Sequence, residues 1–510
     1  MKKILLALVV ACGTLTSCDM NNEPEGTITL GEGIQSMSDV HSARTGLYSY
    51  LRGRSGGTYT TLSDLQTDLF IGTMQNGNSY LPFTTGNILS NDGDIQGIWA
   101  GLLNGIMQCN YYIENVGAYG EHAELSADNR KAFNRYMAEA YFCRGYFNYL
   151  MMYYFCGNYD AATAGNEGTG IPLCLKYQPS SDRGTYPGRS TLAATYTQIE
   201  ADLAKACEGL EEFEATDMQA LVPGGGGYLN SYAVKALQAR VALMKGDYAR
   251  AQALSTDIIQ SGYFPLTQIS DYADMWLNDS GDELIFQPYG DAEQRGEVPA
   301  LGSIFNQVSP LQVKWAPSAA LVQIYAAGDV RRTAFIKNYT VNYNGAQLRT
   351  PAFNKYPGNP LFDSGNVSAL KNLPKPFRTS EQYLILAEAA NALGQDDVAN
   401  EALNTLRAAR IENYEEQSYS GNVLRDQIRQ ERVKELAGEG FRLGDLRRWN
   451  LGFTRDGGYN TTTYPDMGSF IITASLQCVY TPGDYKYVWP IPSAEMETNP
   501  QLKGQQNPGY

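Results

Sequence analysis

The stretch "ARVALMKGDYARAQALSTDI", residues 239–258, has the composition of two helices joined by a tight turn at Gly246-Asp247. A second stretch, "AEAANALGQDDVANEALNTL", residues 387–406, can be aligned with it. The matching pairs are Ala239 with Ala387, Ala242 with Ala390, Gly246 with Gly394, Ala251 with Ala399, and Ile258 with Leu406. Small residues on both sides of a glycine turn let two helices approach closely, which is typical of tetratricopeptide-type repeats. The pattern predicts a mainly α-helical fold built from such helix pairs.

More helices are predicted on both sides of this stretch. Residues 98–116 and 126–156 carry apolar side chains at intervals of three to four, and Ser126 is a suitable N-cap for the second segment. We expect these two segments to pair, and we expect further helices at 191–210 and 423–437. The helical scaffold is therefore predicted to cover about residues 98–260 and 380–450.

Between about residues 262 and 378 the pattern changes. Prolines interrupt this region repeatedly, and short strand-like pieces such as "ELIFQ" (283–287) and "AFIKNYTVNY" (334–343) appear. We interpret it as an irregular, loop-rich lobe with short strands that packs on the helical scaffold. Residues 55–97 are predicted to be loops that precede the first helix, the run "PGGGGYLN" (223–230) a flexible linker, and residues 453–510 loops and short strands.

The N-terminus has the features of an export signal. Lys2 and Lys3 precede an apolar run, Ile4–Cys12, that is much shorter than the roughly 20 residues of a spanning helix. The following Leu15-Thr16-Ser17-Cys18 resembles the lipobox of bacterial lipoproteins, which implies cleavage before Cys18 and lipidation of that cysteine. We expect a signal peptide at 1–17, a lipidated tether at 18–27 and one domain at 28–510.

Composition excludes several classes of function. The net charge of −15 argues against nucleic acid as a partner. Only His41 and His122 are available for a histidine triad or a zinc site, so we expect neither, and no metal or other cofactor. Apart from Cys12 and Cys18, six cysteines show no CxxC spacing; we expect them to be mainly buried thiols, with a disulfide or two as the alternative.

The densest charge cluster is "IRQERVKELAGEGFRLGDLRRW", residues 428–449. A pair of its acids could be read as the carboxylates of a glycosidase. Arginines and a lysine alternate with these acids, however, and a carboxylate beside an arginine is held ionised, which does not suit a general acid. We therefore predict a structural salt-bridge network and no catalytic pair.

Aromatic and carboxamide side chains in loops are the remaining candidates for function. Sugar rings offer C–H faces for stacking and hydroxyls for hydrogen bonding, so a glycan site combines aromatic rings with Asn, Gln, Asp or Arg. Two segments of this kind occur, residues 68–83 and 287–315. The predicted ligand-binding residues are Asp68, Gln75, Asn76, Asn78, Tyr80, Phe83, Tyr289, Gln294, Asn306 and Trp315.

Several longer blocks together resemble one protein family. They are "AEAYFCRGYFNYLMMYYFCG" (138–157) with "GIPL" (170–173), "YLILAEAANALG" (383–394), "LNTLRAAR" (403–410), the charged block 428–449, and "WPIPSAEMETNPQLKGQQNPGY" (489–510). In this order they resemble the SusD/RagB family of surface lipoproteins of the Bacteroidetes. The loop 158–170 is longer than the family usually has.

The resemblance implies a SusD-like fold, in which the irregular lobe at about 262–378 binds the ligand, and a protein that is not an enzyme. Family members lie on the outer face of the outer membrane, held by their lipid, and cap a SusC-like TonB-dependent transporter. They capture oligosaccharides, or peptides in the RagB branch, and deliver them to the transporter. Glycan capture is the function we expect from this chain. The alternatives are capture of oligopeptides and, from a different class, a surface glycosidase.

Overall fold

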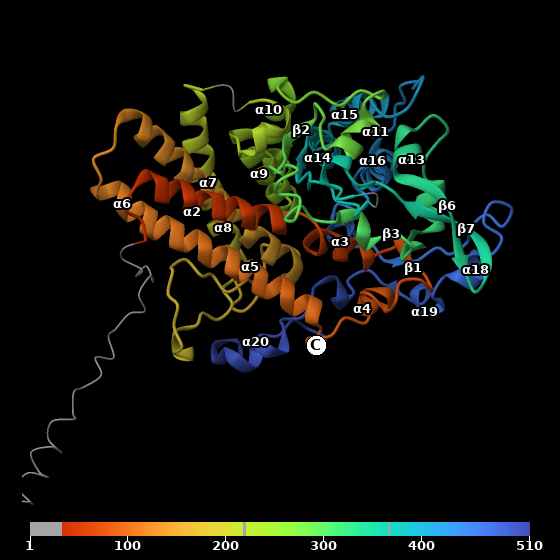
Figure 1. Cartoon of the computed structure of the whole chain (residues 1–510), viewed down its shortest axis with the longest axis horizontal. Helices are drawn as coiled ribbons and strands as arrows, with labels where there is room; N and C mark the ends of the chain where they lie inside the picture. The colour runs from red at the N-terminus through yellow and green to blue at the C-terminus, as the bar shows by residue number, and fades with distance from the viewer. Residues whose placement is uncertain (1–32, 218–220, 366–367) are drawn as a thin grey trace, which may run out of the picture.

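The structure is a computed structural model that describes residues 33–217, 221–365 and 368–510, and helices dominate it (Figure 1). The predictions for the signal peptide, for lipidated Cys18 and for the tether concern residues outside these ranges.

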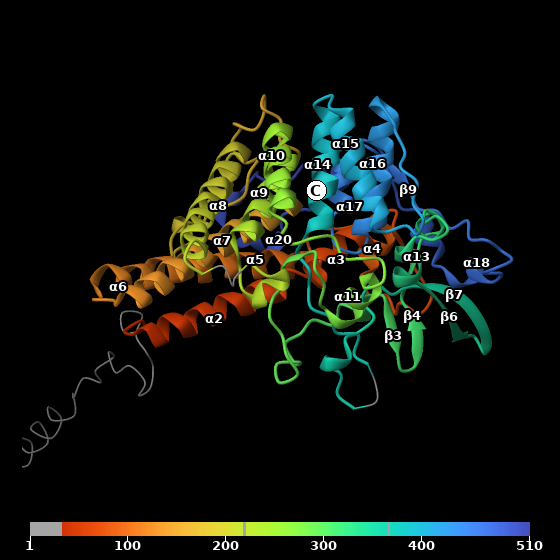
Figure 2. The ribbon, with the colours of Figure 1, turned by 90° about the horizontal axis from the view of Figure 1, so that it is seen from above.

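The helical scaffold consists of long helices, most of which pack against the next helix along the chain. They are α5 (Gly93–Tyr111), α7 (Ala127–Phe155), α8 (Leu192–Glu214), α9 (Ser231–Lys245), α10 (Tyr248–Ser261), α14 (Thr379–Ala392), α15 (Asp396–Ala408) and α16 (Gly421–Leu436). In Figure 2 the helices α8, α9, α10, α14, α15 and α16 stand side by side in a row. The predicted helices are confirmed, and the one at 98–116 continues beyond α5 through a π-helical turn into α6 (Gly117–His122).

The two aligned stretches form stacked helix pairs, as predicted. Gly246 and Gly394 both adopt the left-handed conformation, with φ of 80° and 73°. Glycine enters this region without steric cost and so ends one helix within a single residue. Ala239, Ala242 and Ala251 of the first pair are buried in one cluster with Ile385 and Ala389 of the second pair. The small residues therefore form the interface between the pairs.

The prediction of loops before a first helix near residue 98 was wrong. The chain forms α2 (Met37–Arg54), α3 (Thr58–Leu65) and α4 (Leu81–Thr85) before α5. Helix α2 buries Arg44 and Arg52 as well as Val40, Leu47 and Leu51, so its inner face has no simple apolar pattern. Arg44 is neutralised by Glu139 of α7, a partner that the local sequence does not reveal.

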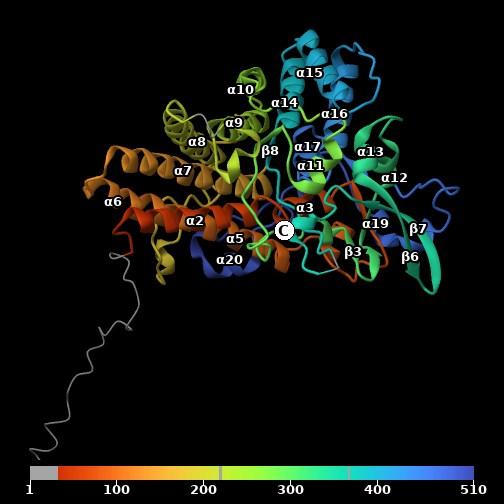
Figure 3. The same ribbon diagram turned by 45° about the horizontal axis from the view of Figure 1, so that its top comes forward.

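The lobe contains two-stranded antiparallel pairs joined by loops. The pairs are β1 (Phe70–Gly72) with β5 (Trp315–Pro317), β2 (Leu284–Phe286) with β8 (Phe377–Arg378), β3 (Asn306–Val308) with β4 (Leu311–Val313), β6 (Ile336–Tyr343) with β7 (Ala346–Phe353), and β9 (Phe453–Thr454) with β10 (Val479–Tyr480). Short helices lie between these strands along the chain: α11 (Tyr272–Asn278), α12 (Ala319–Gln323), α13 (Val330–Phe335), α17 (Arg442–Arg448), α18 (Met467–Phe470) and α19 (Thr473–Leu476); α20 (Ser493–Thr498) follows the last strand. The β6–β7 hairpin lies at the opposite end of the molecule from α6 (Figure 3).

The charged block 428–449 forms the predicted salt-bridge network between scaffold and lobe. Glu435 of α16 is fully buried, and its carboxylate pairs with Arg378 at 2.8 Å, Arg410 at 3.0 Å and Arg331 at 3.2 Å. Burial alone would raise the pKa of Glu435, but the three guanidinium groups more than offset it and hold the pKa well below its usual range. A permanently ionised, enclosed carboxylate is a structural group and does not suit acid catalysis.

Candidate functional site

A cleft of about 440 Å³ lies between α2 and the loop that follows β2. Its volume falls in the range of small-molecule sites. Side chains from one face of α2 form the first wall, and residues 227–228 together with the loop 289–297 form the second. The lining residues are His41, Arg44, Thr45, Gly46, Tyr48, Ser49, Arg52, Gly227, Tyr228, Tyr289, Gln294 and Glu297.

Two tyrosine rings are exposed in this cleft. Tyr228 is 42% exposed and Tyr289 is 53% exposed, although large aromatic side chains bury themselves by default. The Arg44 guanidinium lies 4.3 Å from the centroid of the Tyr228 ring, and the edge of Tyr48 meets the same ring at 90°. Because Arg44 is fixed in turn by Glu139, the Tyr228 ring is held in place before any ligand arrives.

Arg52 of α2 positions the loop that carries Tyr289. One of its nitrogens donates to the backbone oxygen of Tyr289 at 2.9 Å and to Oε1 of Gln294 at 3.1 Å, and another pairs with Glu297. The Tyr289 hydroxyl donates to Asp291 at 2.8 Å, and this hydrogen bond raises the pKa of Tyr289. The loop is therefore anchored through its backbone, and about half of the surface of Tyr289 stays exposed.

A second chamber of about 340 Å³ shares Gly227 and Tyr289 with the first. Its wall is polar and partly preorganised, since buried Asp279 accepts hydrogen bonds from Asn359 at 3.0 Å and from Lys375 at 2.6 Å. Gln287 also lines this chamber; it is 7% exposed, and its Nε2 has no hydrogen-bond partner within the described ranges. We call the two chambers together the Tyr289 cleft.

Gly227 allows the two walls to meet. It has a φ of 83°, and a Cβ at this position would lie 2.5 Å from Cβ of Tyr289. The glycine run was predicted to be a flexible linker, and this was wrong for its central part: Pro223–Gly227 form a 3₁₀ turn that packs against β2. The glycines provide close backbone approach, which larger residues would prevent.

Of the ten predicted ligand-binding residues, the structure places two in this cleft, Tyr289 and Gln294. The segments 68–83 and 306–315 do come together elsewhere, because β1 pairs with β5 and Gln75 bonds to the backbone of Val313 and Asn342. On this second surface Asn78 is exposed, and Gln75 and Tyr80 are partly buried.

The other predicted residues are buried or form hydrogen bonds with other residues of the protein. Phe83 and Trp315 have no exposed surface, and Asn76 is 2% exposed. Asn306 is 3% exposed and donates to the backbone oxygen of Phe353. Asp68 binds Arg442 through two hydrogen bonds of 2.8 and 2.7 Å. Residues without exposed surface cannot stack on a ligand, so we leave the buried four out of the site.

Sequence reasoning missed Tyr48, Arg52 and Tyr228. Tyr48 and Arg52 lie one turn apart on α2, a helix that was not predicted, and Tyr228 directly follows the glycine run. Recognising α2 would have placed the first two on one helix face.

The described residues also bear on other classes of function. No helix among them is long and apolar enough to cross a membrane. Within the same ranges, no group of three or more His, Cys, Asp and Glu residues could hold a metal ion. The six cysteines outside the signal region are free thiols; Cys174 and Cys207 are partly exposed and the others are buried.

Comparison with known proteins gives a consistent picture. A SusD superfamily protein from Bacteroides thetaiotaomicron, 26% identical, superimposes with a TM-score of 0.74 over 93% of this chain and 100% of that chain. The surface glycan-binding protein A from Bacteroides fluxus, 23% identical, gives a TM-score of 0.68 over 94% and 100% of the two chains. "SusD-like protein P2" of Formosa agariphila is 23% identical over the full length of both proteins.

The fold is therefore that of the SusD superfamily, a mostly helical scaffold with an irregular lobe. Two family models match this chain, "Starch-binding associating with outer membrane" over residues 22–223 and "SusD family" over residues 323–510. The chain belongs to the SusD/RagB family.

Proposed function

We propose that this protein is a non-catalytic, cell-surface glycan-capture protein, and that the Tyr289 cleft holds an oligosaccharide. The observation that carries the proposal is the pair of exposed rings of Tyr228 and Tyr289 beside the amides of Gln294 and Gln287, of which Nε2 of Gln287 has no hydrogen-bond partner within the described ranges. The family assignment supports it, as does the description of the Bacteroides fluxus relative as a glycan-binding protein.

The cleft offers the two kinds of contact that a sugar chain requires. The C–H face of a pyranose can stack on each ring, while its hydroxyls exchange hydrogen bonds with the amide of Gln294 and with the amide of Gln287 in the second chamber. Because both chambers share Tyr289, a chain of several sugars can pass over this ring and occupy both.

Delivery to a transporter is the second part of the proposal. Lipidated Cys18 would hold the body on the outer membrane, and a SusC-like TonB-dependent transporter would receive the captured glycan. The resemblance of residues 15–18 to a lipobox and the name of the matching model, which mentions association with the outer membrane, support this part. Replacing Cys18 by Ala should release the mature protein from membranes, measured by fractionation of cells that express each form.

Glycan binding is tested with protein that begins after Cys18, first on an array of poly- and oligosaccharides and then by calorimetry. We expect Tyr289→Ala and Tyr228→Ala each to weaken binding about fivefold to tenfold, since a lost stacking contact is worth about 1 kcal/mol or more. Tyr485→Ala is the matched control, because Tyr485 is a similarly exposed ring (44%) outside the cleft.

Three outcomes would contradict parts of the proposal. Glycan binding that survives both cleft substitutions but is lost in Asn78→Ala would place the site on the loop 68–83. Binding of peptides and of no glycan would show that the ligand class is wrong. Shortened glycan products after incubation with purified protein would show catalysis.

A further inference from the structure

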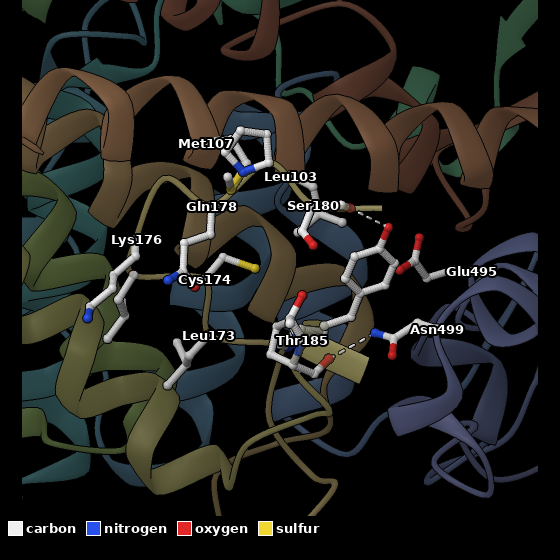
Figure 4. Close-up of a pocket in the computed structure, with 15 residues that line it drawn as sticks. Leu103, Met107, Leu173, Cys174, Lys176, Gln178, Ser180, Thr185, Glu495 and Asn499 are labelled. Carbon is white, nitrogen blue, oxygen red and sulfur yellow. Dashed lines mark hydrogen bonds between the residues drawn. The ribbon is translucent and has the colours of Figure 1, made fainter. Parts of the chain in front are cut away.

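A second cavity, of about 500 Å³, lies apart from the Tyr289 cleft and shares no residue with it. It is enclosed by α5, by the loop 172–187 and by the C-terminal segment that contains α20 (Figure 4). Its walls are mainly apolar, with Leu103 and Met107 from α5 and Leu173, Leu175 and Pro179 from the loop.

The loop that closes this cavity is held in place by hydrogen bonds. Asn110 of α5 donates to the backbone oxygens of Cys174 at 2.9 Å and Lys176 at 3.3 Å. On the far side, Asn499 donates to the backbone oxygen of Pro187 at 2.9 Å, and the Tyr186 hydroxyl donates to that of Ser180 at the same distance. These hydrogen bonds hold the walls of the cavity in one arrangement, which lowers the cost of binding.

One acid faces the cavity. Among the described residues that line it, Glu495 is the only acid and Lys176 the only base, and they lie on opposite sides in Figure 4. Lys176 is exposed to solvent, whereas Glu495 is partly buried and forms no ion pair within the described ranges. Burial raises the pKa of Glu495. Burial raises the pKa of Cys174 to about 11, and the negative charge of Glu495 makes a smaller contribution in the same direction. The Glu495 charge is therefore felt by a thiol that lines the cavity.

We infer that this cavity binds a small molecule with an apolar body and a protonated amine, with the amine on the Glu495 carboxylate. The apolar walls account for the body, since burying apolar surface is the main favourable contribution to binding. The carboxylate accounts for the charge, because the described residues give Glu495 the indole of Trp99 as a neutral partner but no cation, and a protonated amine would supply one. This site is independent of the glycan site, and neither proposal rests on the other.

The test uses three probes that share an indole ring and differ in charge: tryptamine, tryptophol and indoleacetate. Binding to the full mature protein is measured by saturation-transfer NMR and by calorimetry. We expect tryptamine to bind about fivefold more tightly than tryptophol, and indoleacetate to bind most weakly, because the carboxylate is only partly shielded from solvent.

Two substitutions and one control localise the effect. Glu495→Gln should weaken tryptamine about fivefold, to the level of tryptophol, and leave tryptophol unchanged. Glu497→Gln, an exposed acid on the same helix, should change neither. Cys174→Phe should fill the cavity and weaken all three probes, and thermal denaturation checks that this variant is folded.

The inference is overturned if none of the probes binds, if Glu495→Gln keeps the preference for tryptamine, or if binding survives in folded Cys174→Phe. A Tyr289→Ala variant that loses glycan binding and keeps tryptamine binding would show that the two sites bind their ligands independently.

Discussion

Neutralising Glu435 is the sharpest test of how the scaffold and the lobe are joined. This carboxylate accepts hydrogen bonds from Arg378, Arg410 and Arg331 and from the hydroxyl of Tyr272 at 3.1 Å, and none of these side chains has more than a trace of exposed surface. Glu435→Gln keeps the shape of the side chain. It removes the charge and turns an amide N–H₂ group toward guanidinium donors.

The expected loss in the free energy of unfolding depends on the carboxylates that the three arginines keep. Removing one member of a buried ion pair costs about 3–5 kcal/mol of stability. Arg410 keeps Glu283 at 2.5 Å, Arg378 keeps Glu283 at 2.6 Å and Glu439 at 2.5 Å, and Arg331 keeps Asp329 at 2.8 Å and Glu431 at 2.6 Å, so each arginine still has at least one carboxylate. We therefore expect a loss near the lower end, about 3 kcal/mol.

The assay is urea denaturation at neutral pH, followed by far-ultraviolet circular dichroism and by tryptophan fluorescence. Asp426→Asn is the control, since Asp426 is on the same helix but 56% exposed, and its surface pairing is worth at most about 0.5 kcal/mol. Equal midpoints for Glu435→Gln and Asp426→Asn would refute the reasoning. An increase in stability would also refute it, because it would show that burying these charges costs more free energy than their ion pairs contribute.

The difference between wild type and Glu435→Gln should also depend on pH. A carboxylate whose pKa is lowered by folding stabilises the protein above its unfolded pKa, and this stability is lost as the pH falls through the folded pKa. Glu431 is present in both proteins, so the stability that its lowered pKa of about 2 contributes largely cancels from this difference. We expect a constant difference between pH 8 and 5 and a shrinking one below about pH 4.

Two further substitutions test the contact between α3 and the end of α16. Gly440→Ala should destabilise the protein by about 2–4 kcal/mol, because a Cβ would lie 2.7 Å from a backbone oxygen of α3. Gly394→Ala is the control, since Gly394 also has a positive φ but a Cβ there would meet nothing within 4 Å. Thermal denaturation should show a loss of only about 1 kcal/mol for this control. Asp64→Asn should cost about 2–4 kcal/mol in urea denaturation, because the buried carboxylate accepts three backbone N–H groups of residues 438–442 and the amide would present a donor to one of them. Asp92→Asn, an N-cap where both residues serve equally well, should be neutral, and equal losses at the two aspartates would contradict the reasoning.

The helical scaffold was predictable because its signals are local. Small residues around Gly246 and Gly394 give the turn and the close packing from a window of about 20 residues. The charged block 428–449 was predictable for a related reason, since alternating acids and arginines can only be buried as pairs. Helix α2 was missed because the neutralisation of Arg44 depends on Glu139 in another helix, which no local pattern reveals.

The site was only partly predictable from residue types. Tyr289 and Tyr228 are two of 36 tyrosines, and nothing in their own sequence distinguishes an exposed ring from a packed one. Trp315 and Phe83 show the reverse case. They come from loop-like sequence rich in polar residues, yet the pairing of β1 with β5 and the edge-to-face contact of Phe83 with Trp489 bury both completely. Exposure is decided by which segments meet, and this is a property of the tertiary structure.

The charges of the Tyr289 cleft lead to a conclusion about ligand class. Arg44 is paired with Glu139, and Arg52 with Glu297, and both arginines are more than nine-tenths buried. These charges therefore hold the rings and the loop and are not left over to attract an ion. In the first chamber, the glycan that we propose would meet aromatic faces and the amide of Gln294, which discriminate by shape and hydroxyl pattern. Although the whole chain carries a net charge of −15, binding at this cleft should respond little to salt, whereas capture of basic peptides by the acidic surface should weaken steeply with ionic strength.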